Sequence, residues 1–116
     1  MRAIICGGRK FEDRVGGFAF LNEIHSGTPI SFVIEGGAVG GDRIGREWAI
    51  KNNIPYYTYE PDWDGLGPKA GPLRNKQMLV EGKPDVVLAL PGAKGTAHMV
   101  RIAEEANVKV IALNLP

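Results

Sequence analysis

Arginine residues accompany glycine-rich segments at three places in this 116-residue sequence. Arg9 comes directly after two glycines, Arg43 closes the segment 36–43, and Arg74 lies three residues after Gly71. Glycine lets a backbone approach a ligand closely, and arginine grips phosphate or carboxylate with two parallel hydrogen bonds. The pattern therefore indicates an anion site, most often one for phosphate. The alternative is that these arginines pair at the surface with acidic neighbours, namely Glu12, Asp13, Asp42 and Glu47.

Five short apolar runs recur along the chain and are typical of strands buried on both faces. They are 2–6, 31–35, 55–59, 85–90 and 108–113. Three of the segments between them carry stripes of residues at helical spacing: Phe11, Val15, Phe18 and Leu21; Ile44, Gly45, Trp48 and Ala49; and Met99, Ile102, Ala103 and Ala106. A fourth, short helix is expected from about Pro72 to Val80. This alternation predicts one α/β domain over residues 1–116, a Rossmann-like three-layer sandwich with a five-stranded, mainly parallel sheet.

In such a sheet, ligands bind beyond the carboxyl ends of the strands, where the glycine-rich turns lead into helix N-termini. We therefore predict a site for a nucleotide-like, phosphate-bearing ligand at this edge. Its candidate residues are Gly7, Gly8, Arg9, Gly36, Gly37, Gly41, Asp42, Trp63, Arg74, Asn75, Pro91, Gly92, Gly95 and Thr96.

Several of these candidates have a second interpretation. Asp42 and Thr96 are both placed to cap a helix, and Asp42 could instead hold a ribose hydroxyl while Thr96 donates to a phosphate. Asn75 falls on the apolar side of its helix, so it either contacts the ligand or ties down a neighbouring loop. Trp63 lies in the long connection 60–71, where it either stacks on a base or pins a surface loop.

The composition of the chain limits the classes of partner, metal and cofactor that we expect it to bind. The net charge is +1, which argues against nucleic acid as a partner. The two histidines are isolated in sequence and Cys6 is the single cysteine, so we expect no metal centre and no cofactor, and Cys6 is interpreted as a small core residue. His98 faces either the site or solvent. Without a leader or a membrane-length apolar stretch, we expect a cytoplasmic protein with no membrane partner.

Four segments together resemble the YspA/YpsA-related branch of the SLOG superfamily. They are Gly36 to Arg43, Asp62-Trp63, Ala70 to Leu79 with its Gly-Pro-Leu-Arg-Asn block, and Gly95-Thr96. The resemblance implies a Rossmann-like fold, binding or processing of nucleotides and nucleotide-derived ligands, and the formation of homodimers or higher homo-oligomers. The residue after Ala38, often basic in this branch, is Val39 here.

The same superfamily contains the Lonely Guy phosphoribohydrolases, which carry an Arg-Lys pair and a P-G-G-x-G-T-x-x-E motif. Arg74-Asn75 resembles the first, and 91–96 resembles the second, but Met99 stands where the catalytic Glu is expected. A thioether is no general acid or base. We therefore expect a sensor or binding module. The alternative is a nucleotide hydrolase in which Arg74 holds the phosphate and Glu35 supplies the carboxylate, unless Glu35 merely forms a salt bridge at its strand end.

Overall fold

The computed structural model describes residues 1–113. Its strands are β1 (Arg2–Cys6), β2 (Phe32–Glu35), β3 (Tyr56–Thr58), β4 (Val86–Ala89) and β5 (Lys109–Ala112). Its helices are α1 (Arg14–Gly27), α2 (Gly41–Lys51), α3 (Trp63–Leu66), α4 (Ala70–Gly82) and α5 (Lys94–Glu105), with a 3-10 turn, η1 (Gly67–Lys69), between α3 and α4. All five predicted strands are present within the expected runs.

The five strands form one sheet in the order β3-β2-β1-β4-β5, and every pairing is parallel. Ile4 of β1 is in register with Ile34 of β2 on one side and with Val87 of β4 on the other. The α/β Rossmann-like prediction is therefore confirmed, and the mainly parallel sheet is all-parallel over the described strands. The chain order reverses direction at β1, which places the topological switch point between β1 and β4.

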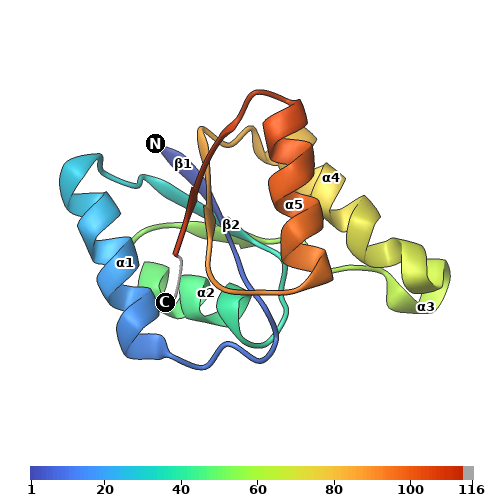
Figure 1. Cartoon of the computed structure of the whole chain (residues 1–116), viewed down its shortest axis with the longest axis horizontal. Helices are drawn as coiled ribbons and strands as arrows, with labels where there is room; N and C mark the ends of the chain where they lie inside the picture. The colour runs from blue at the N-terminus through green and yellow to red at the C-terminus, as the bar shows by residue number, and fades with distance from the viewer. Residues whose placement is uncertain (114–116) are drawn as a thin grey trace.

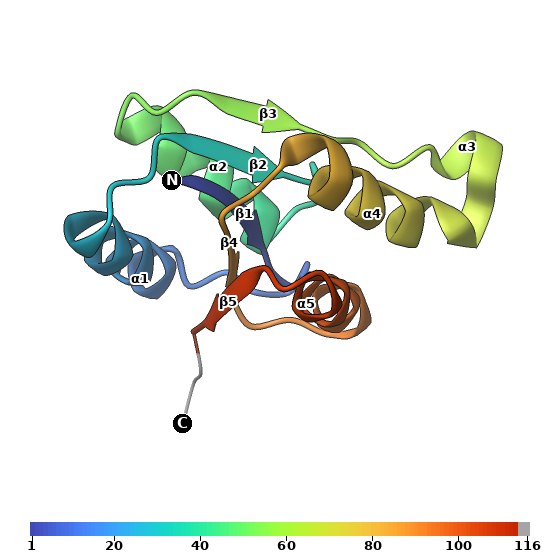
Figure 2. The ribbon, with the colours of Figure 1, turned by 90° about the horizontal axis from the view of Figure 1, so that it is seen from above.

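Helices cover both faces of the sheet (Figures 1 and 2), with α1 and α2 on one side and α4 and α5 on the other. Successive strand residues point to opposite faces. Accordingly, Ala3 and Ile5 pack in the core with Leu21 and Trp48, whereas Ile4 packs in the other core. That second core also holds Cys6, Ile34, Met78 and Met99. The two cores make the three-layer sandwich that the apolar runs predicted.

Three local expectations are corrected. The connection 60–71 is not an open loop, because it contains α3 and η1 and runs directly into α4. The helix expected from about Pro72 to Val80 is longer and spans Ala70–Gly82. Val15 is 83% exposed, so it does not belong to the buried stripe of α1. Among residues 1–113, no helix combines the length and the apolar character needed to cross a bilayer. The predicted domain 1–116 also includes 114–116, which lie outside the described residues.

Candidate functional site

A cavity of about 1120 Å³ lies at the carboxyl edge of the sheet. Most of the predicted ligand-binding residues line it, from five separate stretches of chain. They are Gly7, Gly8, Arg9, Gly36, Gly37, Asp42, Trp63, Arg74, Asn75, Pro91, Gly92, Gly95 and Thr96. Such a volume suffices for a nucleotide-sized ligand. Gly41, Arg43 and Glu35 are not in the lining, and Arg43 is exposed elsewhere on α2.

The floor of the cavity is made where three strand-to-helix turns touch one another through their backbones. The Gly41 N–H donates to the Gly8 carbonyl at 3.0 Å, and the Gly8 N–H donates to the Pro91 carbonyl at 2.8 Å. A Cβ on Gly41 would lie 2.4 Å from the Gly7 Cα, so close that the backbone of one of the turns would have to shift. Gly41 is thus a packing residue rather than a lining residue, and part of the glycine pattern is explained by this close approach.

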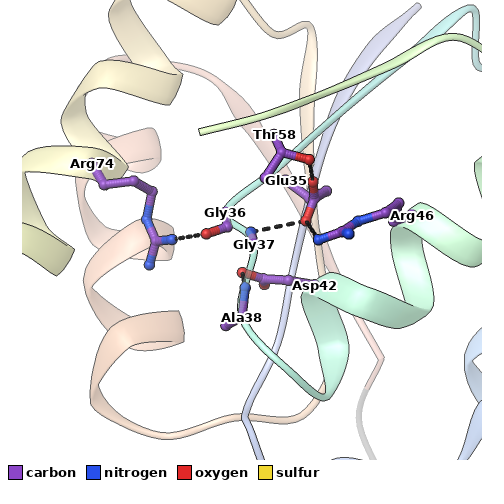
Figure 3. Close-up of polar contacts among 8 residues, drawn as sticks. All are labelled: Glu35, Gly36, Gly37, Ala38, Asp42, Arg46, Thr58 and Arg74. Carbon is purple, nitrogen blue, oxygen red and sulfur yellow. Dashed lines mark hydrogen bonds and ion pairs between the residues drawn. The ribbon is translucent and has the colours of Figure 1, made fainter. Parts of the chain in front are cut away.

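Arg74 reaches from the first turns of α4 to the turn after β2 (Figure 3). Its Nη1 donates to the Gly36 carbonyl, and its Nε donates to Oδ1 of Asn75 at 3.1 Å. Within residues 1–113, Nη2 has no hydrogen-bond partner. Burial lowers the pKa of Arg74 from its ordinary value, although a guanidinium stays charged in proteins. Arg74 is therefore a cation that its neighbours hold in place, and the N–H groups of its Nη2 remain available to donate to a ligand.

Asp42 is the buried carboxylate of the cavity, with 6% of its surface exposed. Burial raises the pKa of Asp42 to about 6, and the nearby Arg74 opposes that rise. The capping prediction is wrong, because Gly40 is the N-cap of α2 and Asp42 reaches back to accept from the Ala38 N–H at 3.3 Å. Asp42 therefore braces the turn after β2.

Thr96 also lacks the capping role predicted for it. The N-cap of α5 is Ala93, and no side chain caps that helix. By contrast, Asp13 caps α1 and Asp62 caps α3, each accepting a backbone N–H at 2.9 Å. The first turn of α5 thus faces the cavity without a capping carboxylate or hydroxyl, so its N–H groups and the positive end of the helix dipole remain available to an anion.

Glu35 lies on the other side of its turn from Arg74 (Figure 3). It is fully buried, and its carboxylate accepts from the Gly37 N–H at 2.8 Å, from Arg46 Nη2 at 3.4 Å and from the Thr58 hydroxyl. Strand alternation explains the direction, because Glu35 shares the face of Val33, which packs with α2 rather than α4. The salt-bridge interpretation of Glu35 therefore holds, and the structure does not bring it to Arg74.

Arg9 and Trp63 meet at the rim of the cavity. The Arg9 guanidinium carbon lies 5.7 Å from the centroid of the indole ring, within cation–π range. Trp63 begins α3, is 46% exposed and lies against Gly71. Trp63 thus presents part of its ring to the lining, and the same ring packs against the start of α4.

The charges of the lining favour an anion. Four cationic side chains line the cavity, against two acidic ones. The cationic residues are Arg9, Lys10, Arg74 and Lys94, and the acidic residues are Asp42 and Glu60. Lys94 opens α5, where a cation opposes the helix dipole by about 0.3–1 kcal/mol unless an anion lies nearby.

Comparison with known proteins agrees with this geometry. A sequence model of the YspA, cpYpsA-related SLOG family matches residues 1–65. The chain belongs to this SLOG family. It is also similar to "Gene 61 protein" of Mycobacterium phage D29, with 36% identity over 118 residues that cover 95% of this chain and 94% of the relative. Membership of the SLOG family indicates a nucleotide-related function, whereas the name of the phage relative specifies none.

Two further residues of this SLOG protein clarify its chemistry. Met99, at the position that resembles the phosphoribohydrolase Glu, is 1% exposed and packs in the core against the sheet. Cys6 is also buried, and burial, followed by the effect of Asp42, raises the pKa of its thiol to about 12. The core interpretation of Cys6 is confirmed, and neither position offers a reactive group.

Sequence reasoning left His98 undecided, and the structure brings it to the cavity. His98 lines the cavity, with its Nδ1 3.1 Å from Nδ2 of Asn75. Asn75 is 5% exposed and also donates to the Gly95 carbonyl at 3.2 Å. Asn75 therefore ties α4 to the start of α5, one of the two roles predicted for it. The histidine contact depends on how α4 packs on α5, which no local pattern reveals.

Proposed function

We propose that this SLOG protein binds a nucleotide or nucleotide-derived phosphate ligand at the carboxyl edge of its sheet and acts as a sensor or binding module. The observation that carries the proposal is the placement of Arg74, held by Gly36 and Asn75 while Nη2 remains for a ligand. The cationic lining and the uncapped first turn of α5 support it, since both favour phosphate oxygens. In this proposal Trp63, which lines the cavity beside Arg9, stacks on the base of the ligand.

Binding without turnover is the simpler interpretation because the cavity lacks the expected acid–base pair. Glu35 is committed to three donors on the far side of its turn, and Met99 is buried in the core. Neither Glu35 nor position 99 therefore supplies the carboxylate that the related phosphoribohydrolases would lead us to expect for glycosidic hydrolysis. The ligand would instead be held by donors, and released unchanged.

Isothermal titration calorimetry against nucleoside mono- and diphosphates, cyclic nucleotides and ADP-ribose derivatives tests this proposal. We expect at least one to bind, and we expect Arg74→Lys to weaken that binding at least tenfold because lysine lacks the planar fork. Arg43→Lys is the matched control, since Arg43 is exposed outside the lining, and it should bind like the unaltered protein. Absence of binding by the whole panel up to millimolar concentrations refutes the proposal.

A hydrolase remains the second candidate, carried by Asp42 rather than by Glu35. Asp42 lines the cavity close to Arg74, and a carboxyl whose pKa is raised to about 6 can exchange a proton near neutral pH. This candidate predicts release of free base from a nucleoside monophosphate, measured by chromatography, and its loss in Asp42→Asn. Turnover that persists in Asp42→Asn would remove Asp42 from the reaction.

A further inference from the structure

The orientation of the Asn75 side-chain amide is fixed by its neighbours. Its Oδ1 lies 3.1 Å from Nε of Arg74, which can only donate a hydrogen bond. Its Nδ2 lies 3.2 Å from the Gly95 carbonyl, which can only accept one. Exchanging the oxygen and the nitrogen would set donor against donor and acceptor against acceptor. The amide nitrogen therefore points toward α5.

This orientation fixes the proton of His98. The second N–H of the Asn75 amide faces Nδ1 of His98 at 3.1 Å. Because an amide nitrogen donates only, Nδ1 must accept, and the ring proton belongs on Nε2. An imidazolium would carry a proton on both nitrogens and lose this contact. Burial lowers the pKa of His98 and Arg101 lowers it further, against an opposing effect of Glu105, and the net direction favours the neutral ring.

His98 also lies on the right part of α5 to meet an anion there. It stands one turn after Lys94 and Gly95, which places it on the same face of the helix as the uncapped first turn. Helical side chains lean toward the N-terminus, so the imidazole projects back over that turn. His98, Asn75 and Gly95 all line the cavity.

We propose that His98 is a ligand-binding residue whose Nε2–H donates to an anionic oxygen of the ligand, in the phosphate class, at the N-terminus of α5, and that Asn75 is the positioning residue that selects this tautomer. The inference rests on the proposed function. Arg74 donates to Asn75 and Asn75 donates to His98, so the hydrogen bonds run in one direction and end on a donor. Arg74 and His98 would thereby hold the same anion from α4 and α5.

The tautomer is tested without any ligand by ¹⁵N NMR of the imidazole nitrogens at neutral pH. The chain has two histidines, and His25 is an internal reference because its Nδ1 accepts the Ile30 N–H at 2.9 Å. We expect both rings in the Nε2–H form. Asn75→Asp replaces the donor by an acceptor, which should move the His98 proton to Nδ1 and leave His25 unchanged. A His98 ring with its proton on Nδ1 in the unaltered protein overturns the proposal, even if Asn75→Asp fails to fold.

The ligand role is tested with AMP, ADP-ribose and inorganic phosphate as probes. Glutamine can place an N–H where Nε2 lies, whereas asparagine reaches only the position of Nδ1. For the probe that binds best, we expect His98→Gln to stay within about threefold and His98→Asn to weaken binding at least tenfold, the worth of one hydrogen bond to a charged group. Equal binding by both variants and the unaltered protein overturns the role of His98 alone. If the unaltered protein binds none of the three probes, the ligand role of His98 is overturned, and a positive result elsewhere in the nucleotide panel would still leave the proposed function standing.

Discussion

The guanidinium of Arg9 lies over the indole ring of Trp63, 5.7 Å from its centroid, and this contact joins the turn after β1 to the start of α3. The remainder of α3 lies beyond the end of the sheet, next to the N-terminus of α4 (Figure 2). The rim of the cavity is therefore built from a cation and an exposed aromatic ring, while the floor is built from backbone.

Trp63 should report ligand binding by fluorescence. The chain has two tryptophans, and Trp48 is fully buried in the core, so a ligand-induced change should come from Trp63. We expect the change in the unaltered protein and its loss in Trp63→Phe. Trp63→Ala should weaken binding of a nucleotide by about 1–3 kcal/mol, the usual worth of base stacking. Tyr57→Ala, an exposed aromatic outside the lining, should leave affinity unchanged; an equal loss there would argue against stacking on Trp63.

Asp42 should make stability depend on pH in an unusual direction. Because burial raises its pKa to about 6 from an ordinary 3.8, the folded state binds this proton more tightly than the unfolded state does. The resulting stabilisation is complete below about pH 4 and is lost as pH rises through about 6. Its size is on the order of 3 kcal/mol at 1.36 kcal/mol per pKa unit.

Asp42→Asn should remove this pH dependence and unfold at a higher temperature than the unaltered protein above pH 6. Calorimetric scans between about pH 4 and pH 8 measure the difference between the two profiles. Asp64→Asn is the control, because Asp64 is exposed on α3 and should leave the profile unchanged. Parallel profiles for Asp42→Asn and the unaltered protein would contradict the raised pKa.

Gly41→Ala should cost stability through a backbone clash. The added methyl would meet the Gly7 Cα at 2.4 Å, and the turns after β1 and β2 would have to separate. We expect a loss of at least about 1–3 kcal/mol in the free energy of unfolding, measured with urea. Gly27→Ala, at the end of α1, is the control, since its Cβ would meet no atom within 4 Å. Similar values for the two variants would show that the turns can move apart cheaply.

Glu35→Gln should lower the stability of the fold and leave the affinity for the ligand unchanged. The amide oxygen of glutamine could still accept from the Gly37 N–H and Arg46, and its nitrogen could donate to the Thr58 hydroxyl, which also accepts. The substitution nevertheless removes the negative charge that pairs with Arg46 inside the protein, and we expect this to cost about 1–3 kcal/mol of stability. Glu47→Gln, which removes a more exposed pair with Arg14, should cost less than about 1 kcal/mol. Unchanged nucleotide affinity in folded Glu35→Gln is expected; a large loss would reopen a role for Glu35 at the ligand.

The sequence predicted the fold and the location of the cavity because both depend on local patterns. Apolar runs such as 2–6 and 85–90 show strands buried on two faces, and parallel topology brings the turns that follow them to one edge. The direction in which a side chain points at that edge, by contrast, was not predicted from the sequence. Glu35 and Arg74 are neighbours of the same turn, yet strand parity sends Glu35 toward α2 while Arg74 arrives from α4.

Contacts between helices were beyond the reach of sequence patterns. Asn75 was predicted to be a buried polar residue, but its partner His98 is known only once the packing of α4 on α5 is known. Likewise, a stretch rich in glycine and proline indicates a loop, and the turns of α3 and η1 form there through local hydrogen bonds such as that of Asp62.

The backbone contacts among Gly7, Gly8, Gly41 and Gly92 have a consequence for how ligand preference can diversify. Because the floor consists of main chains in direct contact, it contains no volume that a single substitution could enlarge or fill. Single substitutions in the floor therefore cannot adjust the shape of the cavity to a different ligand. Variation in ligand choice must therefore come from the rim, at positions such as Trp63 and Val39, where side chains are exposed and replaceable. This division predicts that engineered libraries confined to the rim will retain folded proteins while changing which nucleotide is preferred.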